Sequence, residues 1–146
     1  MKASKSIEIA APPGAVWPYF VDPEKVLGWC ITFKKYEYSG AQQGGVGTPL
    51  YIEEDAGTGL TKMNFEVTGW KENERVDLHM LSGGNYKRYE QHWWLEAVPG
   101  GSRFTFSEEI DLPYGALGKL IGLFAERMSA RTLDKMLPRL KSMAEA

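Results

Sequence analysis

The chain opens with the segment Ser6-Ile-Glu-Ile-Ala-Ala-Pro-Pro-Gly-Ala-Val-Trp17, which predicts a strand followed by a helix. Residues 4–10 alternate enough in polarity to indicate a strand. Two short helices are predicted next, one over residues 15–21 and one from Asp22-Pro23-Glu24 to about residue 29. Proline in the first turn of a helix and aspartate at its N-cap are both typical of helix starts.

After these helices the hydrophobic period changes to two, which indicates strands. Two-residue Gly-Gly loops between alternating runs are typical of β-hairpins, and the chain has them at Gly83-Gly84 and at Gly100-Gly101. The predicted strands cover residues 32–39, 49–55, 61–70, 75–81, 86–98 and 103–111.

These loops also predict the strand registers. Taking 72–73, 83–84 and 100–101 as the loops sets Val67 opposite Leu78, Leu78 opposite Tyr89, and Trp93 opposite Glu108. All three registers gather the apolar side chains on one face, whereas a slip of one residue would invert the faces. The predicted inner face carries Met63, Phe65, Val67, Val76, Leu78, Met80, Tyr89, Trp93, Leu95, Phe104 and Phe106. Trp70, Trp94 and both histidines are predicted on the outer face.

A long C-terminal helix is predicted from about Pro113 to near the end of the chain. Its apolar residues recur at intervals of three and four, as in an amphipathic helix: Leu117, Leu120, Ile121, Phe124, Met128, Leu137 and Leu140. The expected class is therefore α+β, with a curved antiparallel sheet around this helix. A strongly bent sheet rarely fills its interior with one helix, so a pocket is expected between them.

Composition narrows the classes of function. The chain has 146 residues, 43% of them hydrophobic, which suits one domain over 1–146 with a real core. A net charge of −2 provides no basic field for nucleic acid. No apolar run approaches the ~20 residues of a membrane span, and no signal peptide is evident, so a cytoplasmic protein is expected. The single cysteine, Cys30, is expected to be a buried structural thiol rather than a nucleophile.

The opening segment to Trp17, together with Asp22-Pro23-Glu24 and Trp29, resembles the polyketide cyclase/dehydrase branch of the START-like (SRPBCC) superfamily. Phe65-Glu-Val-Thr-Gly-Trp70 is similar to that family's central strand, and Trp93-Trp-Leu-Glu-Ala-Val-Pro-Gly-Gly-Ser-Arg-Phe104 to its last hairpin. The resemblance implies a helix-grip fold, in which seven antiparallel strands curl around the C-terminal helix and enclose a deep pocket. Family members bind lipids, hormones, polyketides or quinones, and some are aromatase/cyclases. The matching residues support the fold, so no catalytic residue is carried over.

The candidate ligand-binding residues are those that face the expected pocket: Phe65, Met80, Tyr89, Gln91, Trp93, Phe104, Phe106, Glu108, Ile121, Phe124 and Met128. Each ring could equally be plain core. Glu108 and Gln91 are the more specific signals, because an inward carboxyl group must be paired, protonated or hydrated. Glu108 and Tyr89 are the candidate acid/base groups. The alternative places Glu108 at an open rim, near solvent or Lys87.

The sequence does not indicate a metal site or a phosphate-binding loop. The registers set His79 opposite Arg88 and His92 opposite Arg75, roughly 13 Å apart, which is too far for one zinc ion. Gly44-Gly45-Val46-Gly47-Thr48 lacks the lysine and the following helix of a phosphate loop, and is predicted to be a flexible turn at the pocket mouth. Neither a metal nor a cofactor is predicted.

Three hypotheses follow. The first is binding of a small hydrophobic or amphipathic ligand of the lipid, polyketide or quinone type. The second is a polyketide-type cyclase, aromatase or dehydratase that uses Glu108 or Tyr89. The third is a protein-interaction or lipid-chaperone module that uses the outward tryptophans Trp70 and Trp94. A monomer or a homodimer is compatible with all three.

Overall fold

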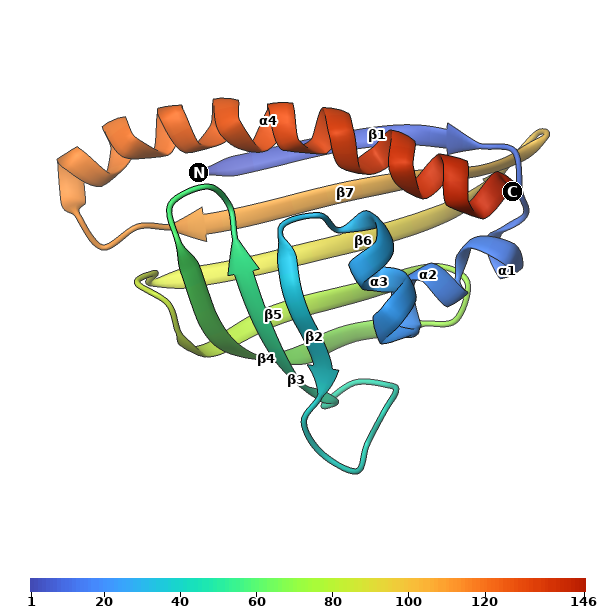
Figure 1. The fold of residues 1–146 in the computed structure, drawn as a ribbon, viewed down its shortest axis with the longest axis horizontal. Helices are drawn as coiled ribbons and strands as arrows, with labels where there is room; N and C mark the ends of the chain where they lie inside the picture. The colour runs from blue at the N-terminus through green and yellow to red at the C-terminus, as the bar shows by residue number, and fades with distance from the viewer.

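The computed structural model describes residues 1–146, and its centre is a curled antiparallel sheet of seven strands with a long helix along one side (Figure 1). The strands lie in the order β1-β7-β6-β5-β4-β3-β2, so the first and second strands form the two edges. The predicted α+β helix-grip fold is confirmed. The elements are β1 (Lys2–Ile9), α1 (Pro13–Val16), α2 (Pro18–Val21), α3 (Pro23–Trp29), β2 (Phe33–Tyr38), β3 (Pro49–Asp55), β4 (Leu60–Lys71), β5 (Arg75–Gly83), β6 (Arg88–Val98), β7 (Gly101–Asp111) and α4 (Gly115–Glu145).

The short helices between β1 and β2 follow the prolines. The helix predicted over 15–21 is divided into α1 and α2 at Pro18, which has no N–H with which to continue the first helix. Asp22 caps α3 as predicted, because its Oδ1 accepts a hydrogen bond from the Glu24 backbone N–H at 3.0 Å. These helices cover one end of the concave face of the sheet (Figure 1).

Two predicted registers are wrong by two residues. Trp93 pairs with Phe106 rather than Glu108, because the two-residue turn is Pro99-Gly100 instead of Gly100-Gly101. Leu78 pairs with Gln91 rather than Tyr89, because the chain between β5 and β6 forms a longer connection than the two glycines alone. Since a shift of two residues keeps each side chain on its face, the predicted inner face is nevertheless buried. The register of β4 on β5, with Val67 opposite Leu78, is confirmed.

A β-bulge in β4 reverses one predicted side chain. The pairing shifts between Val67 and Gly69, so that Trp70 lies opposite Val76 and turns inward rather than outward. Its ring meets that of Trp17 edge-on, with centroids 5.3 Å apart. The predicted pair of outward tryptophans is therefore reduced to Trp94, whose side chain is 43% exposed.

The two halves of α4 pack differently. In the C-terminal half, Leu133, Met136, Leu137 and Leu140 are buried against the core. In the N-terminal half only Gly118 and Gly122 are buried, and the residues of the predicted apolar stripe are exposed to solvent. This corrects the expectation of one continuous buried stripe. The exposed residues of that stripe are Leu117, Leu120, Ile121, Phe124 and Met128.

The open stripe results from the way the helix is docked. Gly118 and Gly122 are the buried residues of the N-terminal half, and a Cβ at Gly122 would lie 3.8 Å from Cβ of Met1. The glycine face lets α4 lie close to β1. The larger side chains of this half lie on other faces of the helix. None of the helices combines the length and the apolar character needed to cross a bilayer.

The two halves of α4 should respond differently to the same truncation. Leu137→Ala removes a fully buried side chain and should lower the free energy of unfolding by about 2–5 kcal/mol. Leu120→Ala, its matched control, removes a side chain that is 57% exposed and should change it by less than about 0.5 kcal/mol. Urea unfolding measures both values. Equal losses in the two variants would contradict the docking of α4 described here.

Candidate ligand-binding pocket

A cavity of about 260 Å³ lies between the sheet and the N-terminal half of α4. Thirteen of its twenty lining residues are hydrophobic, so a molecule inside it would meet apolar surface over most of its area. Seven of the predicted ligand-binding residues line the cavity, contributed by β6, β7 and α4: Tyr89, Gln91, Phe106, Glu108, Ile121, Phe124 and Met128.

The other four predicted residues, Phe65, Met80, Trp93 and Phe104, do not line the cavity but pack within the core. The ring of Trp93 meets Trp29 of α3 edge-on at 5.3 Å, and the ring of Phe104 lies 5.1 Å from that of Phe20 in α2. The short helices thus fill one end of the concave face. The cavity occupies the other end, between the sheet and the N-terminal half of α4.

The glycine-rich segment Gly44–Thr48 does not border this cavity, contrary to its predicted place at the mouth. The connection between β2 and β3 lies far from α4 in Figure 1, and a Cβ at Gly44 would lie 3.4 Å from the ring of Trp70. The turn between β3 and β4 borders the cavity instead, through Ala56 and Thr58. A Cβ at Gly57 in that turn would lie 3.5 Å from the end of the Met128 side chain on α4.

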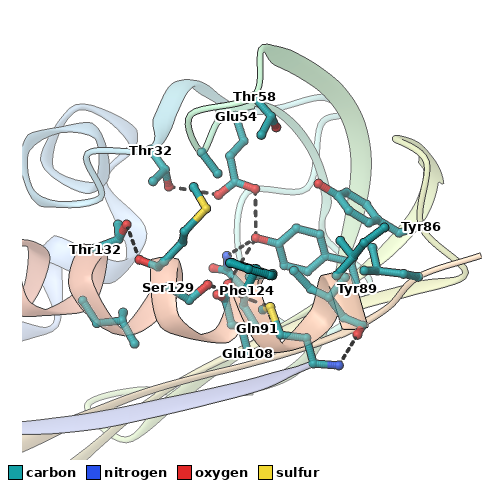
Figure 2. Close-up of a pocket in the computed structure, with 18 of the residues that line it drawn as sticks. Thr32, Glu54, Thr58, Tyr86, Tyr89, Gln91, Glu108, Phe124, Ser129 and Thr132 are labelled. Atoms are coloured by element: carbon teal, nitrogen blue, oxygen red, sulfur yellow. Dashed lines mark hydrogen bonds between the residues drawn. The ribbon is translucent and has the colours of Figure 1, made fainter. Parts of the chain in front are cut away.

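A chain of hydrogen bonds ends at a carboxyl group inside the cavity (Figure 2). Trp93 Nε1 donates to Gln91 Oε1 at 3.1 Å, and Gln91 Nε2 donates to the Tyr89 hydroxyl at 2.8 Å. Tyr89 in turn donates to Glu54 Oε1 at 2.9 Å, and the Thr32 hydroxyl donates to Glu54 Oε2, also at 2.9 Å. Each of these four groups therefore donates within the cluster, and two of them stabilise the Glu54 carboxylate.

Glu108 is the second carboxyl group of the cluster and is only 8% exposed. Its Oε2 lies 3.4 Å from the Tyr89 hydroxyl, whereas Glu54 Oε1 lies at 2.9 Å from the same oxygen. A phenol has one proton, so Tyr89 donates to one carboxylate at a time, and the shorter contact favours Glu54. Glu108 is thus buried with a weak partner. The alternative of Glu108 at an open rim beside Lys87 is wrong.

Burial raises the pKa values of both carboxyl groups. Burial, followed by the nearby charge of Glu54, raises the pKa of Glu108 to about 7 against the opposing hydrogen bonds of Ser129 and Tyr89. Burial also raises the pKa of Glu54, while hydrogen bonds from Tyr89 and Thr32 hold it down. The carboxyl pair therefore gains or loses one proton near neutral pH, and Glu108 is the group that holds this proton.

Glu54 was not among the predicted site residues, although its sequence contained a usable signal. It follows Leu50 and Ile52 at intervals of two in a predicted strand, so alternation alone places it on the inner face. Both of those leucine and isoleucine side chains are fully buried. A second inward carboxyl group could therefore have been inferred beside Glu108.

Cys30 lies fully buried at the end of α3. Burial, and then the charge of Glu54, raises its pKa well above the ordinary thiol value, so the thiol stays protonated. The structural role predicted for Cys30 agrees with this environment.

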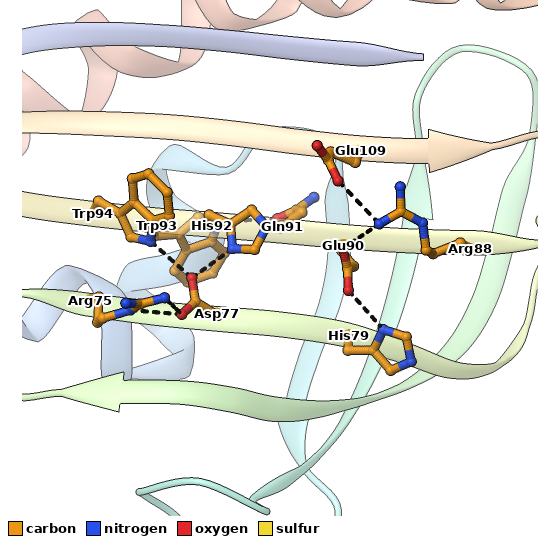
Figure 3. Close-up of polar contacts among 10 residues, drawn as sticks. All are labelled: Arg75, Asp77, His79, Arg88, Glu90, Gln91, His92, Trp93, Trp94 and Glu109. Atoms are coloured by element: carbon orange, nitrogen blue, oxygen red, sulfur yellow. Dashed lines mark hydrogen bonds and ion pairs between the residues drawn. The ribbon is translucent and has the colours of Figure 1, made fainter.

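The histidines lie on the outer face of the sheet, each beside an acidic residue (Figure 3). His92 Nδ1 lies 2.6 Å from Asp77 Oδ1, which also accepts a hydrogen bond from Trp94 Nε1 at 2.9 Å. His79 pairs with Glu90 rather than Arg88, with 3.3 Å between its Nδ1 and Glu90 Oε1. No group of three or more His, Cys, Asp or Glu side chains is arranged to hold a metal ion.

Comparison with known proteins agrees with this architecture. Residues 1–145 match the family described as polyketide cyclase/dehydrase and lipid transport, and the chain belongs to that family. No curated protein sequence matches it significantly.

Solved structures with the same fold are distant in sequence. A protein of Thermus thermophilus superimposes with a TM-score of 0.81 at 18% identity, covering 99% of this chain and 97% of that chain. A START superfamily protein of Mycobacterium smegmatis gives 0.77 at 15% identity, with the same coverage. The Zhui aromatase/cyclase of a Streptomyces species gives 0.72 at 15% identity, covering 99% and 93%. The family is that of polyketide cyclases, dehydrases and lipid transport, so the chain is a hydrophobic-ligand-binding domain of that type, and its fold is the one that the START superfamily protein also has.

Proposed function

We propose that this protein binds a small amphipathic molecule in the cavity beneath α4. The observation that carries the proposal is a largely apolar cavity of about 260 Å³ with a hydrogen-bonded carboxyl pair inside it. Burial of the apolar part of the ligand provides the driving force, at roughly 25 cal/mol per Å² before the cost of immobilisation. The polar cluster around Tyr89 fixes the orientation of the ligand.

The open stripe of α4 supports the same proposal. Ile121, Phe124 and Met128 line the cavity and are also 40–66% exposed, so they form its mouth. A ligand whose polar group reaches Tyr89 would cover these side chains with its apolar body. Apolar surface that is exposed in the empty protein would then be buried in the complex.

Filling the cavity from α4 should abolish binding. Ala125 lines the cavity, so Ala125→Phe should weaken binding of N-phenyl-1-naphthylamine, an uncharged probe that fluoresces in apolar sites, by at least about tenfold. The matched control is Ala130→Phe, which alters an exposed position one helical turn further on and should leave the dissociation constant unchanged. Fluorescence titration gives the constants. Equal binding by both variants, or no saturable binding by the parent protein, would contradict the proposal.

A second candidate function is acid/base catalysis on a ligand held in the same cavity. Glu108 favours it, because a buried carboxyl group with a pKa of about 7 can donate or accept a proton at neutral pH. The Tyr89 hydroxyl beside it could polarise a ligand carbonyl group. A cavity that holds a poly-β-carbonyl chain in a folded shape would favour cyclisation by proximity.

Glu108→Gln separates the two candidates. If Glu108 is a general acid, the variant should turn over a poly-β-carbonyl thioester with kcat/KM at least about 100-fold lower, and parent activity should fall as pH rises past about 7. Glu109→Gln, on the opposite face of β7, is the matched control and should keep its activity. Binding of the thioester without turnover by the parent protein would reject catalysis and leave the binding function standing.

A further inference from the structure

At the inner end of the cavity the hydroxyl groups beside the carboxyl pair already donate within the protein, whereas the carboxyl oxygens can accept further hydrogen bonds. The hydroxyl groups of Thr32 and Tyr89 donate to Glu54, and Gln91 donates to Tyr89. Ser129 Oγ, on the α4 side, lies 4.0 Å from the sulfur of Met1 and also faces Glu108, whose pKa its hydrogen bond lowers. A ligand that enters the cavity therefore meets oxygen atoms that can accept further hydrogen bonds, above all those of Glu108.

The charged side chains of the cavity are all acidic. No Lys, Arg or His side chain is among its lining residues, whereas Glu54 and Glu108 both are. The amino group of Met1, at the edge of the lining, is engaged by the Ile110 carbonyl oxygen at 2.8 Å. A ligand carboxylate at the inner end would form a third acidic group beside Glu54 and Glu108, in a desolvated space where no Lys, Arg or His side chain balances it.

On the assumption that the proposed binding function holds, we infer that the ligand carries a hydrogen-bond donor as its polar group, an amine in preference to a hydroxyl, and that carboxylate ligands are rejected. The ammonium group contacts Glu108 and Glu54 at the inner end of the cavity, and the apolar body leads out past Phe124. Selectivity arises because the carboxyl groups attract an amine ligand, whereas a carboxylate ligand would be buried beside them without a partner of opposite charge.

Three ligands with the same apolar chain test this inference: octylamine, octanol and octanoate, titrated calorimetrically into the protein at pH 8. Octylamine should bind at least tenfold more tightly than octanoate, with octanol between them. Octanoate binding as tightly as octylamine would overturn the inference while leaving the proposed function intact. No binding of any of the three, combined with failure of the naphthylamine probe, would overturn both.

The pH dependence supplies a test in the unaltered protein. Between pH 6 and pH 8 Glu108 ionises, whereas the amine and the carboxylate of the two probes keep their charges. Affinity for octylamine should therefore rise with pH and affinity for octanoate should fall. Parallel changes would overturn the inference. The groups around Glu108 in this titration are Glu54 from β3, Tyr86, Tyr89 and Gln91 from β6 and the connection before it, Ser129 from α4, Thr32 and Cys30 from the segment before β2, and the amino group of Met1.

Glu108→Gln removes the charge and keeps the shape of the side chain. The preference of the variant for octylamine over octanoate should drop at least fivefold, and the opposite pH trends should disappear. Glu109→Gln removes a carboxylate one residue away, on the outer face where Glu109 pairs with Lys2 and Arg88, and should keep the parent preference. An equal drop in both variants would assign the selectivity to the overall charge of the protein and would overturn the inference.

Discussion

The site depends on a single phenolic hydroxyl placed between two buried carboxyl groups. Tyr89 Oη is within hydrogen-bond reach of Glu54 and Glu108, and it is itself anchored through Gln91 to the core tryptophan Trp93. Without this bridge, two carboxyl groups would face each other across a desolvated space, which is costly for the folded state. The bridge lets one carboxylate keep its charge while the other holds a proton.

The fold creates this environment by filling only half of its interior. The short helices α2 and α3 insert Phe20 and Trp29 into one end of the concave face, where they contact Trp93 and Phe104. At the other end α4 approaches the sheet through Gly118 and Gly122. The first end gives the domain a close-packed core, and the second leaves space for a guest next to polar groups that the core holds in place.

The sequence predicted which face of the sheet each side chain occupies better than which residue it pairs with on the neighbouring strand. Alternation is preserved by a shift of two residues, so the misplaced turn at Pro99-Gly100 changed the partner of Trp93 without moving its side chain off the inner face. The bulge before Gly69 is different, because one extra residue inverts the alternation and turned Trp70 inward. The local signal of that extra residue is Gly69, because a glycine inside a strand often marks a bulge.

The cavity itself was harder to predict than the fold. Periodicity identified the apolar stripe of α4 but not how the helix is rotated against β1, since that depends on the contacts of Gly122 with a strand more than a hundred residues earlier. Glu108, Tyr89 and Gln91 were found because alternation points them inward. Glu54 obeys the same rule, since it alternates with the buried Leu50 and Ile52 in β3.

The most direct test of this account is a carbon-13 NMR titration of the side-chain carboxyl groups in glutamate-labelled protein, with Glu108→Gln used to assign the signal. A resonance that titrates near pH 7, and is absent from the variant, would show the buried carboxyl pair that the ligand site requires. If every glutamate titrated near its ordinary value of about 4.3, Glu108 would be a solvated surface group, and the account of the site would be contradicted.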